Sequence, residues 1–371
     1  MKLKTILAFS LSLLGTYQVA KLHSRYRHPL VRQSHRERLL EAVDTDREIN
    51  WLTEDAFEEG WHEHLTPYLD ERRQAGFIQT ELGQLAYEYY SIDQAQATCI
   101  IVHGYNEFKE KYRELVYYLL QAGIQVFAYD GRGHGDSRIN KQETQINILD
   151  FRDYVADLET VLTYVERKNA PQHRVFLFGH SMGGAVVTHM AQVFPDRLSG
   201  LILSAPMLAV KTRNIPTEWA HIYASLMQKL GRGRDYLPEK TDPASTQHLV
   251  YQSPNHLADS DVRGSFFFHL NYQLHQYPTH SGSFNWLKAA LDYLQLIQSP
   301  RRIANMTLPV LMFRSGQDQL VPKEGLFNMQ VNLKDSLNFV IPDSQHEILS
   351  GHDEQVKAIV SQIIHFINRA E

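Results

Sequence analysis

The run VFLFGHSMGGAVVTHM, residues 175–190, places a small nucleophilic side chain between two glycines. Four apolar residues typical of a buried strand lead into Gly179, and apolar residues return with helical spacing after Gly183. A serine on a sharp strand-to-helix turn holds its hydroxyl clear of the sheet, and the glycines remove side chains that would collide across the turn. We therefore predict that Ser181 is a nucleophile. The first N–H groups of the new helix should point towards the reacting carbonyl oxygen.

A serine hydroxyl is a useful nucleophile only when a base takes its proton and a third group orients that base. Asp318 follows the apolar run in LPVLMFRSGQDQLVP, and His346 follows the next run in LNFVIPDSQHEIL. Each therefore lies just past the end of a predicted strand, where open α/β sheets place their sites. Asp343 is nearer to His346 in sequence, but closeness along the chain is not the relevant geometry, so Asp318 is preferred as the acid.

The oxyanion that such an attack creates needs hydrogen-bond donors. We expect the backbone N–H groups of Met182 and Tyr105 to supply them, Tyr105 being in the loop of IIVHGYNEF after an earlier strand. Gly104 would let that loop approach the site closely. His103 could be mistaken for a second base, and a structural hydrogen-bonding role beside the oxyanion hole is the favoured interpretation.

The histidine-rich and glycine-rich stretches do not have the spacing of metal or nucleotide sites. Two histidines at i and i+2 in WHEHL, residues 61–65, point to different sides of a helix and favour a solvated face. In HEILSGH, Ser350 stands where a zinc motif needs its second histidine. GRGHGDS lacks the Lys-Ser/Thr pair of a phosphate-binding loop. We expect no metal and no cofactor.

Strands and helices alternate from Ala97 onward. Continuous apolar runs predict strands at CIIVHG, IQVFAYD, RVFLFG, GLILSAP, LPVLMFRSG and LNFVIPDS, and helices are expected over 108–122, 149–167, 182–194 and 355–369. Before them, residues 35–75 look mainly helical, and GFIQTELGQLAYEYYSI predicts an antiparallel hairpin that turns at Gly83. This pattern predicts an α/β fold with a mostly parallel sheet covered by helices on both faces.

One interval, residues 206–305, lacks the apolar strand pattern. A segment of about a hundred residues is too long for a loop in a compact α/β domain. We therefore predict a mainly helical cap inserted between two parts of the core, residues 35–205 and 306–371.

The composition is that of an ordinary folded protein, with 371 residues of which 43% are hydrophobic and 21% charged. The single cysteine, Cys99, excludes an intramolecular disulfide and is interpreted as a small buried hydrophobe. The net charge is −5, although residues 1–38 carry eight basic side chains and one acidic one. The acidic remainder argues against a nucleic-acid partner.

Residues 1–34 form a basic leader in which Thr5–Ala20 gives sixteen uncharged, mostly apolar residues. Gln18 and Ala20 make a poor cleavage site, and the positive charge that follows disfavours export. We favour an uncleaved anchor or membrane-surface segment with the body on the cytoplasmic face. Export with a cleaved leader is the alternative.

The motifs VHGYNEFKEKY, YDGRGHGDS, GHSMGGAV, GQDQLV and QHEIL, in this order, resemble those of the lysophospholipase L2 and monoacylglycerol lipase branch of the α/β-hydrolases, a group that is serine aminopeptidase S33-like. The similarity spans roughly residues 75–370 and leaves out the leader. It implies an α/β-hydrolase fold, with Ser181, Asp318 and His346 as nucleophile, acid and base. It also implies hydrolysis of a fatty acyl ester in a lysophospholipid or monoacylglycerol.

A lipid substrate is compatible with the aromatic residues of the predicted cap. Trp219 shares one helical face with Ile222, Leu226 and Leu230, and Phe267 and Trp286 lie in SFFFHL and SFNW. We expect Trp219, Phe267 and Trp286 to contact the substrate, the alternative being that these residues pack the cap onto the body.

Two other functions fit the same scaffold. An aminopeptidase would need carboxylates directed at the site from the cap. A non-catalytic lipid- or protein-binding protein is disfavoured by the complete set of nucleophile, acid, base and oxyanion donors.

Overall fold

The structure, a computed structural model, describes residues 37–170, 173–212, 215–238 and 250–370. A nine-stranded sheet runs through it in the order β1-β11-β10-β8-β7-β4-β5-β3-β2. Neighbouring strands from β1 to β5 in this order are parallel, whereas β3 pairs antiparallel with β5 and β2. The strands are β1 (Glu37–Leu39), β2 (Arg73–Thr80), β3 (Gly83–Tyr90), β4 (Ala97–Val102), β5 (Ile124–Tyr129), β7 (Arg174–His180), β8 (Gly200–Ser204), β10 (Val310–Ser315) and β11 (Ser336–Ile341).

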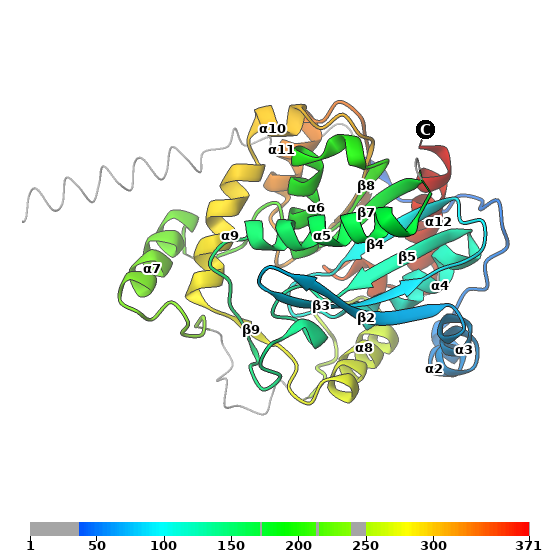
Figure 1. Cartoon of the computed structure of the whole chain (residues 1–371), viewed down its shortest axis with the longest axis horizontal. Coiled ribbons are helices and arrows are strands. Elements are labelled where there is room, and N and C mark those ends of the chain that lie inside the picture. The colour runs from blue at the N-terminus through cyan, green and yellow to red at the C-terminus, as the bar shows by residue number, and fades with distance from the viewer. Residues whose placement is uncertain (1–36, 171–172, 213–214, 239–249, 371) are drawn as a thin grey trace, which may run out of the picture.

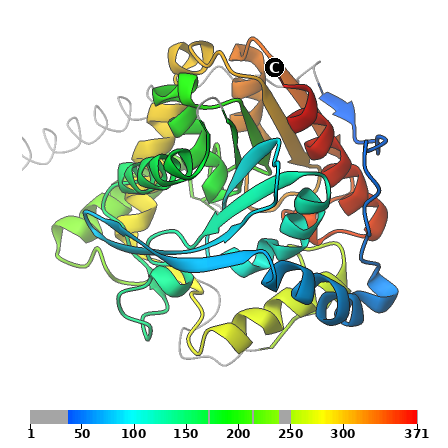
Figure 2. The ribbon, with the colours of Figure 1, turned by 45° about the vertical axis from the view of Figure 1, so that its right-hand side comes forward.

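Helices cover both faces of this sheet, as Figures 1 and 2 show. One face packs against α5 (Arg152–Lys168), α6 (Met182–Val193), α9 (Phe284–Ile297) and α11 (Lys323–Asn332), and the other packs against α4 (Arg113–Gln121) and α12 (Asp353–Arg369). Successive residues of β7 alternate between the two cores, Val175 and Leu177 facing one and Phe176 and Phe178 the other. Because both faces of the central strands are buried, strands such as β4, β5, β7 and β8 are mostly continuous apolar runs, and the predicted fold class is confirmed.

The N-terminal part of the described chain differs from the prediction of a mainly helical segment over 35–75. Residues 37–39 form β1, which pairs with β11 at the edge of the sheet, and no helix occurs between Leu40 and Thr53. Short helices follow: a 3-10 turn at Glu54–Ala56, α2 (Phe57–Gly60), a π-helical turn at Trp61–Leu65 and α3 (Thr66–Asp70). The edge pairing explains the difference, since Arg314 of β10 also binds the Glu37 carboxylate at 2.7 and 2.8 Å.

The other local predictions agree with the structure, apart from small shifts at element ends. The hairpin β2–β3 turns at Gly83, where φ is +144°. The helix expected from residue 108 begins as a 3-10 turn at Lys109–Tyr112 before α4, and Gly123, with φ +85°, follows its C-terminal cap. Cys99 is buried in β4, and burial raises the pKa of its thiol to about 12.

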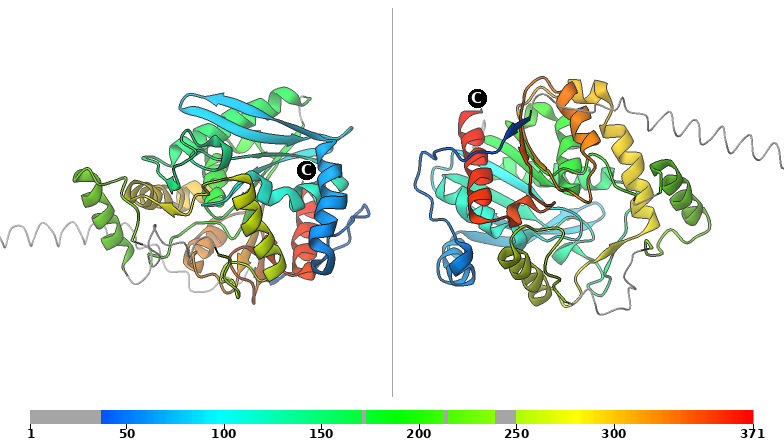
Figure 3. Two further views of the ribbon diagram at one scale, coloured as in Figure 1. Left: turned by 90° about the horizontal axis from the view of Figure 1, so that it is seen from below. Right: turned by 180° about the vertical axis from the view of Figure 1, so that it is seen from behind.

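The segment between β8 and β10 contains helices that pack in three different places. Helix α9 lies in the main core with α5 and α6, whereas α7 (Thr217–Lys229) packs outside it on α9. Helix α8 (Asp261–Leu274) lies beside the N-terminal helices, as Figure 3 shows, with the Phe266 ring centroid 4.8 Å from that of Trp61. A fourth helix, α10 (Pro300–Ala304), precedes β10, and the short strand β9 (Ser281–Gly282) pairs with β6 (Gln145–Ile146). The domain boundaries at 206 and 305 remain predictions.

Candidate active site

Ser181 occupies a strained turn between β7 and α6. Its φ of +49° and ψ of −118° lie outside the regions that side chains other than glycine ordinarily adopt. Two backbone hydrogen bonds hold this conformation: the Ser181 N–H donates to the Ser204 carbonyl at 3.0 Å, and the Met207 N–H donates to the Ser181 carbonyl at 2.8 Å. The strain is therefore sustained by β8 and the residues that follow it.

The glycines on either side of Ser181 allow close packing across the turn. A Cβ atom at position 179 would lie 2.5 Å from Val187 Cγ2, and one at position 183 would lie 2.1 Å from the Val102 carbonyl oxygen. Real Cβ atoms do not approach other atoms so closely. Both glycines are needed for the reason expected from the sequence, which is that β4, β7 and α6 meet here without intervening side chains.

The side chains of Ser181, His346 and Asp318 form one hydrogen-bonded chain. His346 Nε2 lies 2.9 Å from Ser181 Oγ, and His346 Nδ1 lies 2.7 Å from Asp318 Oδ2. An ionised carboxylate can only accept, so Nδ1–H donates to Asp318 and Nε2 is left to accept the serine proton. The other carboxylate oxygen of Asp318 accepts from the backbone N–H groups of Leu320 and Val321, at 2.7 and 2.9 Å.

Asp318 is held ionised despite its partial burial. Burial would raise its pKa, but the hydrogen bond and charge of His346, together with the two backbone N–H groups, lower the pKa below its usual value. Asp343, the alternative acid, is exposed at the surface. The residue that reaches His346 is thus the one more distant in sequence.

The two expected oxyanion donors lie at the start of α6 and on the loop after β4. Met182 is the first residue of α6, where a backbone N–H has no acceptor within its own helix. Tyr105 lines the cleft beside Ser181 on the loop after β4. His103 on that loop bonds the Gly104 carbonyl through Nδ1 at 2.7 Å and accepts from the Gly131 N–H through Nε2 at 2.8 Å. These two bonds confirm its structural role.

A cleft of about 490 Å³ opens over the serine. Its walls contain Ser181, His346 and Tyr105 together with nine apolar or aromatic neighbours: Phe108, Met207, Val210, Leu257, Phe267, Phe268, Trp286, Leu320 and Val321. Polar side chains also line it, among them Asn106, Lys211, Asn255, Asn271 and His280. Phe267 and Trp286 thus line the same cleft as Ser181, and their contact with a substrate stays a prediction. The Trp286 ring also packs against that of Tyr105, with centroids 4.5 Å apart.

Trp219 does not line this cleft, and its expected contact with the substrate stays a prediction. Its side chain is 53% exposed on α7. The buried side of α7 consists of Ala220, Ala224 and Met227, with the latter two packed on Phe284 of α9. Because these residues face the body, the opposite side of the helix carries Trp219 into solvent.

Beside Ser181 and His346 lies an ionic cluster that the sequence did not reveal. It consists of Glu107, Lys111, Glu347 and His180, and we call it the cleft cluster. Lys111 Nζ lies 2.6 Å from Glu107 Oε1 and 2.9 Å from Glu347 Oε1. The only local signal for it was the i,i+4 pair of opposite charges in EFKEK.

Charge and burial in the cleft cluster favour an ionised Glu107 and a neutral His180. Burial would raise the pKa of Glu107, but Lys111 and His180 lower it well below its usual range. Burial lowers the pKa of His180 to about 4, against the opposing effect of Glu107. His180 also bonds Ser204 Oγ through Nδ1 at 3.0 Å.

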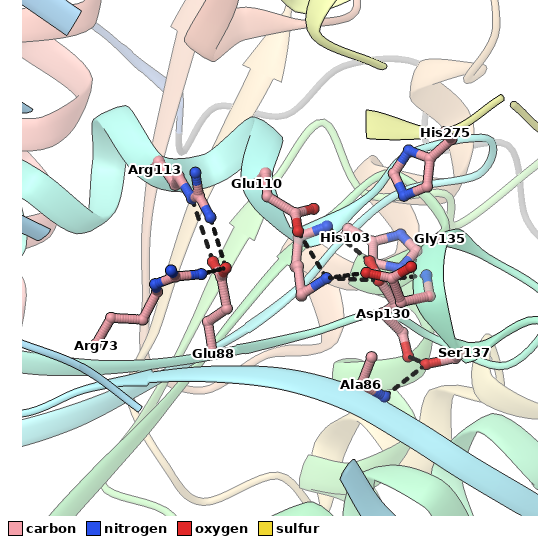
Figure 4. A network of polar contacts seen from close by, with 12 residues as sticks. Arg73, Ala86, Glu88, His103, Glu110, Arg113, Asp130, Gly135, Ser137 and His275 are labelled. Atoms are coloured by element: carbon pink, nitrogen blue, oxygen red, sulfur yellow. Dashed lines mark hydrogen bonds and ion pairs between the residues drawn. The ribbon is translucent and has the colours of Figure 1, made fainter. Parts of the chain in front are cut away.

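A second buried cluster has residue types that could bind a metal ion. Ligand atoms of Glu110, Asp130 and His275 lie within 4.8 Å of one another. Figure 4 shows the side chains of Glu110, Asp130 and His275 close to one another. The ammonium group of Lys109 already lies among the carboxylates, 2.7 Å from Glu110 Oε1 and 3.0 Å from Asp130 Oδ2. Since the protein supplies its own cation there, the arrangement does not favour a metal.

A serine on a strand-to-helix turn, a histidine and an aspartate after later strands, and a mostly parallel sheet define the α/β-hydrolase class. A family model described as serine aminopeptidase, S33, matches residues 93–354. The chain belongs to this family, as its motifs suggested.

Relatives and solved structures support the same class. A probable lysophospholipase L2 from Haemophilus influenzae is 25% identical over 272 residues, covering 72% of this chain and 83% of the relative. A monoacylglycerol lipase from Mycolicibacterium smegmatis is 25% identical over 277 residues, covering 74% and 89%. The structure of a monoglyceride lipase from Saccharomyces cerevisiae matches with a TM-score of 0.64 at 17% identity, covering 80% of this chain and 95% of that one. The protein is therefore an α/β-hydrolase enzyme of the esterase and lipase class.

The predicted leader, residues 1–34, lies outside the described residues. Within the part of the chain that the structure describes, no helix combines the length and apolar character that crossing a bilayer requires.

Proposed function

We propose that this enzyme hydrolyses the fatty acyl ester of a lysophospholipid or a monoacylglycerol. The observation that carries the proposal is the chain from Ser181 Oγ through His346 to Asp318, with distances of 2.9 and 2.7 Å, below a largely apolar cleft. Such a cleft suits a long acyl chain, since each buried methylene contributes roughly 0.8 kcal/mol. The names of the relatives from Haemophilus influenzae and Mycolicibacterium smegmatis favour the same substrates.

In the proposed first half-reaction, Ser181 Oγ attacks the ester carbonyl carbon while His346 Nε2 takes the hydroxyl proton. The carbonyl oxygen becomes an oxyanion, which the N–H groups of Met182 and Tyr105 bind. Asp318 holds the imidazole in the required tautomer and stabilises the imidazolium. When the tetrahedral intermediate collapses, His346 gives its proton to the leaving glycerol oxygen, and the acyl group stays on Ser181.

In the second half-reaction, water takes the place of the departed alcohol. His346 removes a proton from it, the hydroxide oxygen attacks the acyl carbonyl, and the same N–H groups bind the second oxyanion. Collapse returns the proton from His346 to Ser181 Oγ and releases the fatty acid. Both half-reactions use the same three side chains, so no cofactor enters the cycle.

An aminopeptidase remains the alternative, and the family description names that activity. Its substrate's amine would need a free carboxylate in the cleft. Among the cleft residues that the structure describes, the carboxylates are Glu107 and Glu347, and both are ion-paired with Lys111. None comes from the segment 206–305, which favours an ester substrate over a peptide.

Release assays on wild type and Ser181→Ala test the proposal. Mass spectrometry would follow fatty-acid release from a panel of lysophospholipids, monoacylglycerols and short esters, with an aminoacyl-naphthylamide in parallel. Removal of the nucleophile should reduce kcat by at least about 10⁴-fold while the circular dichroism spectrum is unchanged. Full activity of Ser181→Ala on a lysolipid would refute the assignment, and cleavage of the naphthylamide alone would favour the peptidase.

The proposal includes association with a membrane surface through residues 1–34, whose basic and apolar composition supports it. Deleting residues 2–34 should move the enzyme from the membrane pellet to the supernatant and leave its kcat on a soluble short ester unchanged. An unchanged distribution would contradict this part of the proposal.

A further inference from the structure

Two loops that are far apart in sequence must face each other across Ser181. The loop after β4 carries Tyr105, and the loop after β11 carries His346. A donor or base displaced by about 1 Å can lower the rate roughly 10²-fold. The relative position of these loops is therefore a requirement of the reaction, and something must fix it.

The first loop is anchored through the buried carboxylate of Glu107. Glu107 Oε2 accepts from the N–H of Gly104, which directly precedes Tyr105, at 2.5 Å. The same oxygen accepts from the hydroxyl of Tyr112 at 2.6 Å. Hydrogen bonds to an ionised acceptor are among the stronger ones in proteins. This bond fixes the His103–Gly104 peptide, one residue before the Tyr105 N–H, so the path of the loop into Tyr105 depends on where the Glu107 carboxylate is held.

Lys111 joins this carboxylate to the loop of the histidine. Its ammonium group lies 2.6 Å from Glu107 Oε1 and 2.9 Å from Oε1 of Glu347, the residue that directly follows His346. The lysine side chain is 13% exposed and that of Glu347 is 20% exposed, so water only partly screens the ion pairs that Lys111 forms.

We propose that Lys111 is a positioning residue. It acts as an ionic bridge between the loop after β4, which carries Tyr105, and the loop after β11, which carries His346. This inference rests on the proposed function, because it assigns the bridge a role in that reaction. Without the bridge, Tyr105 and His346 no longer keep their relative position. The loss falls on kcat, because both groups act mainly in the transition state.

The bridge also sets the charge that surrounds His346. The charged or titratable groups on the elements packed around it are Asp318, Glu347, Glu107, Lys111 and His180, together with Asp259, which accepts from the N–H of the preceding residue. Replacing Lys111 leaves two carboxylates without their cation and should stabilise a protonated imidazole. Replacing Glu347 removes one of those carboxylates and should have the opposite effect.

A double-mutant cycle on the full-length enzyme tests the inference, with Lys111→Met, Glu347→Gln and the double variant assayed on one short soluble ester. We expect each single variant to lose about 10- to 100-fold in kcat with little change in KM, and the double variant to lose no more than one single. The acid-side midpoint of the kcat/KM profile should move up by about half a pH unit in Lys111→Met and down in Glu347→Gln. The double variant should return towards wild type.

Lys357→Met serves as the control, because Lys357 forms an exposed ion pair with Glu354 on α12 at 3.3 Å. It should leave kcat and the midpoint unchanged. Losses in kcat that add in the double variant, or midpoints that move in the same direction in both singles, would overturn the inference. Fluorophosphonate labelling separates this result from the proposed function. Variants that still label at Ser181 and behave additively refute only the bridge, whereas a wild type that fails to label refutes both.

Discussion

The stretch Glu107–Lys111 supplies two ionic clusters that face in different directions. Glu107 and Lys111 belong to the cleft cluster, beside Ser181 and His346. Lys109 and Glu110 belong to a second cluster with Asp130 and Asp136, which we call the sealed cluster. Figure 4 shows Glu110, Asp130 and His275 of this second region. Neighbouring residues of one short 3-10 turn, Lys109–Tyr112, thus belong to two different clusters.

The two clusters differ in what they connect. In the sealed cluster, Asp130 accepts from the backbone N–H groups of Lys109 and Asp136, both at 2.8 Å, and so ties the turn to the loop after β5. Neither the turn Lys109–Tyr112 nor the loop after β5 itself carries a proposed catalytic group. The cleft cluster connects the two loops that do. Similar residue types therefore support the fold in one place and the reaction in the other, and the attached loops make the difference.

The largest effect on stability is expected from Lys109→Met. It leaves the carboxylates of Glu110 and Asp130 buried without their cation, which should lower the free energy of unfolding by about 3–5 kcal/mol. Urea denaturation would measure the loss. Lys141→Met is the matched control, because Lys141 binds the same Asp136 at 3.3 Å from an exposed position, where a pair contributes about 0–1 kcal/mol.

The structural role given to the sealed cluster would be contradicted if Lys109→Met were as stable as Lys141→Met. It would also be contradicted if the folded Lys109→Met protein lost kcat as strongly as Lys111→Met. In that case both clusters would position the reacting groups.

Much of the fold could be predicted because its central strands are buried on both faces. A strand such as β7 is a continuous apolar run whatever its neighbours are, so local sequence is sufficient to identify it. Strand β1 could not be found in this way. It exists because β11, from the other end of the chain, offers it an edge and Arg314 binds Glu37. The sequence around Glu37 gives no local signal of the pairing with β11.

Local sequence could likewise predict some of the site residues, but not those that are brought together only by the fold. Ser181, Asp318 and His346 each follow a predicted strand, and parallel strands bring their carboxyl ends to one edge. Helical periodicity put Trp219 on an apolar face but could not say whether that face meets the body or solvent. The bridge through Lys111 to Glu347 joins residues far apart in sequence, so only the fold reveals it.

The pH dependence of stability would further test the difference between the sealed cluster and the cleft cluster. The pKa of Glu110 is raised from 4.5 to about 7, first by burial and then by repulsion from Asp130, against the attraction of Lys109. Between these two values the native state binds more protons at Glu110 than the unfolded state does. The stability contributed by this group is therefore present at low pH and is lost as the pH rises through about 7.

Glu110→Gln removes this titration. Relative to wild type, the variant should gain about 2 kcal/mol in the free energy of unfolding between pH 5 and pH 8. Denaturation of both proteins at several pH values would measure it, and other titrating groups cancel in the difference. A difference that does not change with pH would show that Glu110 keeps its charge throughout, and that the sealed cluster is no more strained by burial than the cleft cluster.

The smallest effect is expected at Asp259, which holds the histidine loop from the other side. Asp259 Oδ1 accepts from the N–H of Gln345, which directly precedes His346, at 2.8 Å. A backbone bond from the Glu347 N–H to the Leu257 carbonyl at 2.7 Å would remain without it. Asp259→Ala should therefore lower kcat only about 5-fold, the equivalent of one hydrogen bond. Asp259→Asn keeps an acceptor and should stay within about 2-fold of wild type. Equal losses in the two variants would mean that the charge of Asp259 matters and its hydrogen bond does not, and that the loop depends on ionic contacts from both sides.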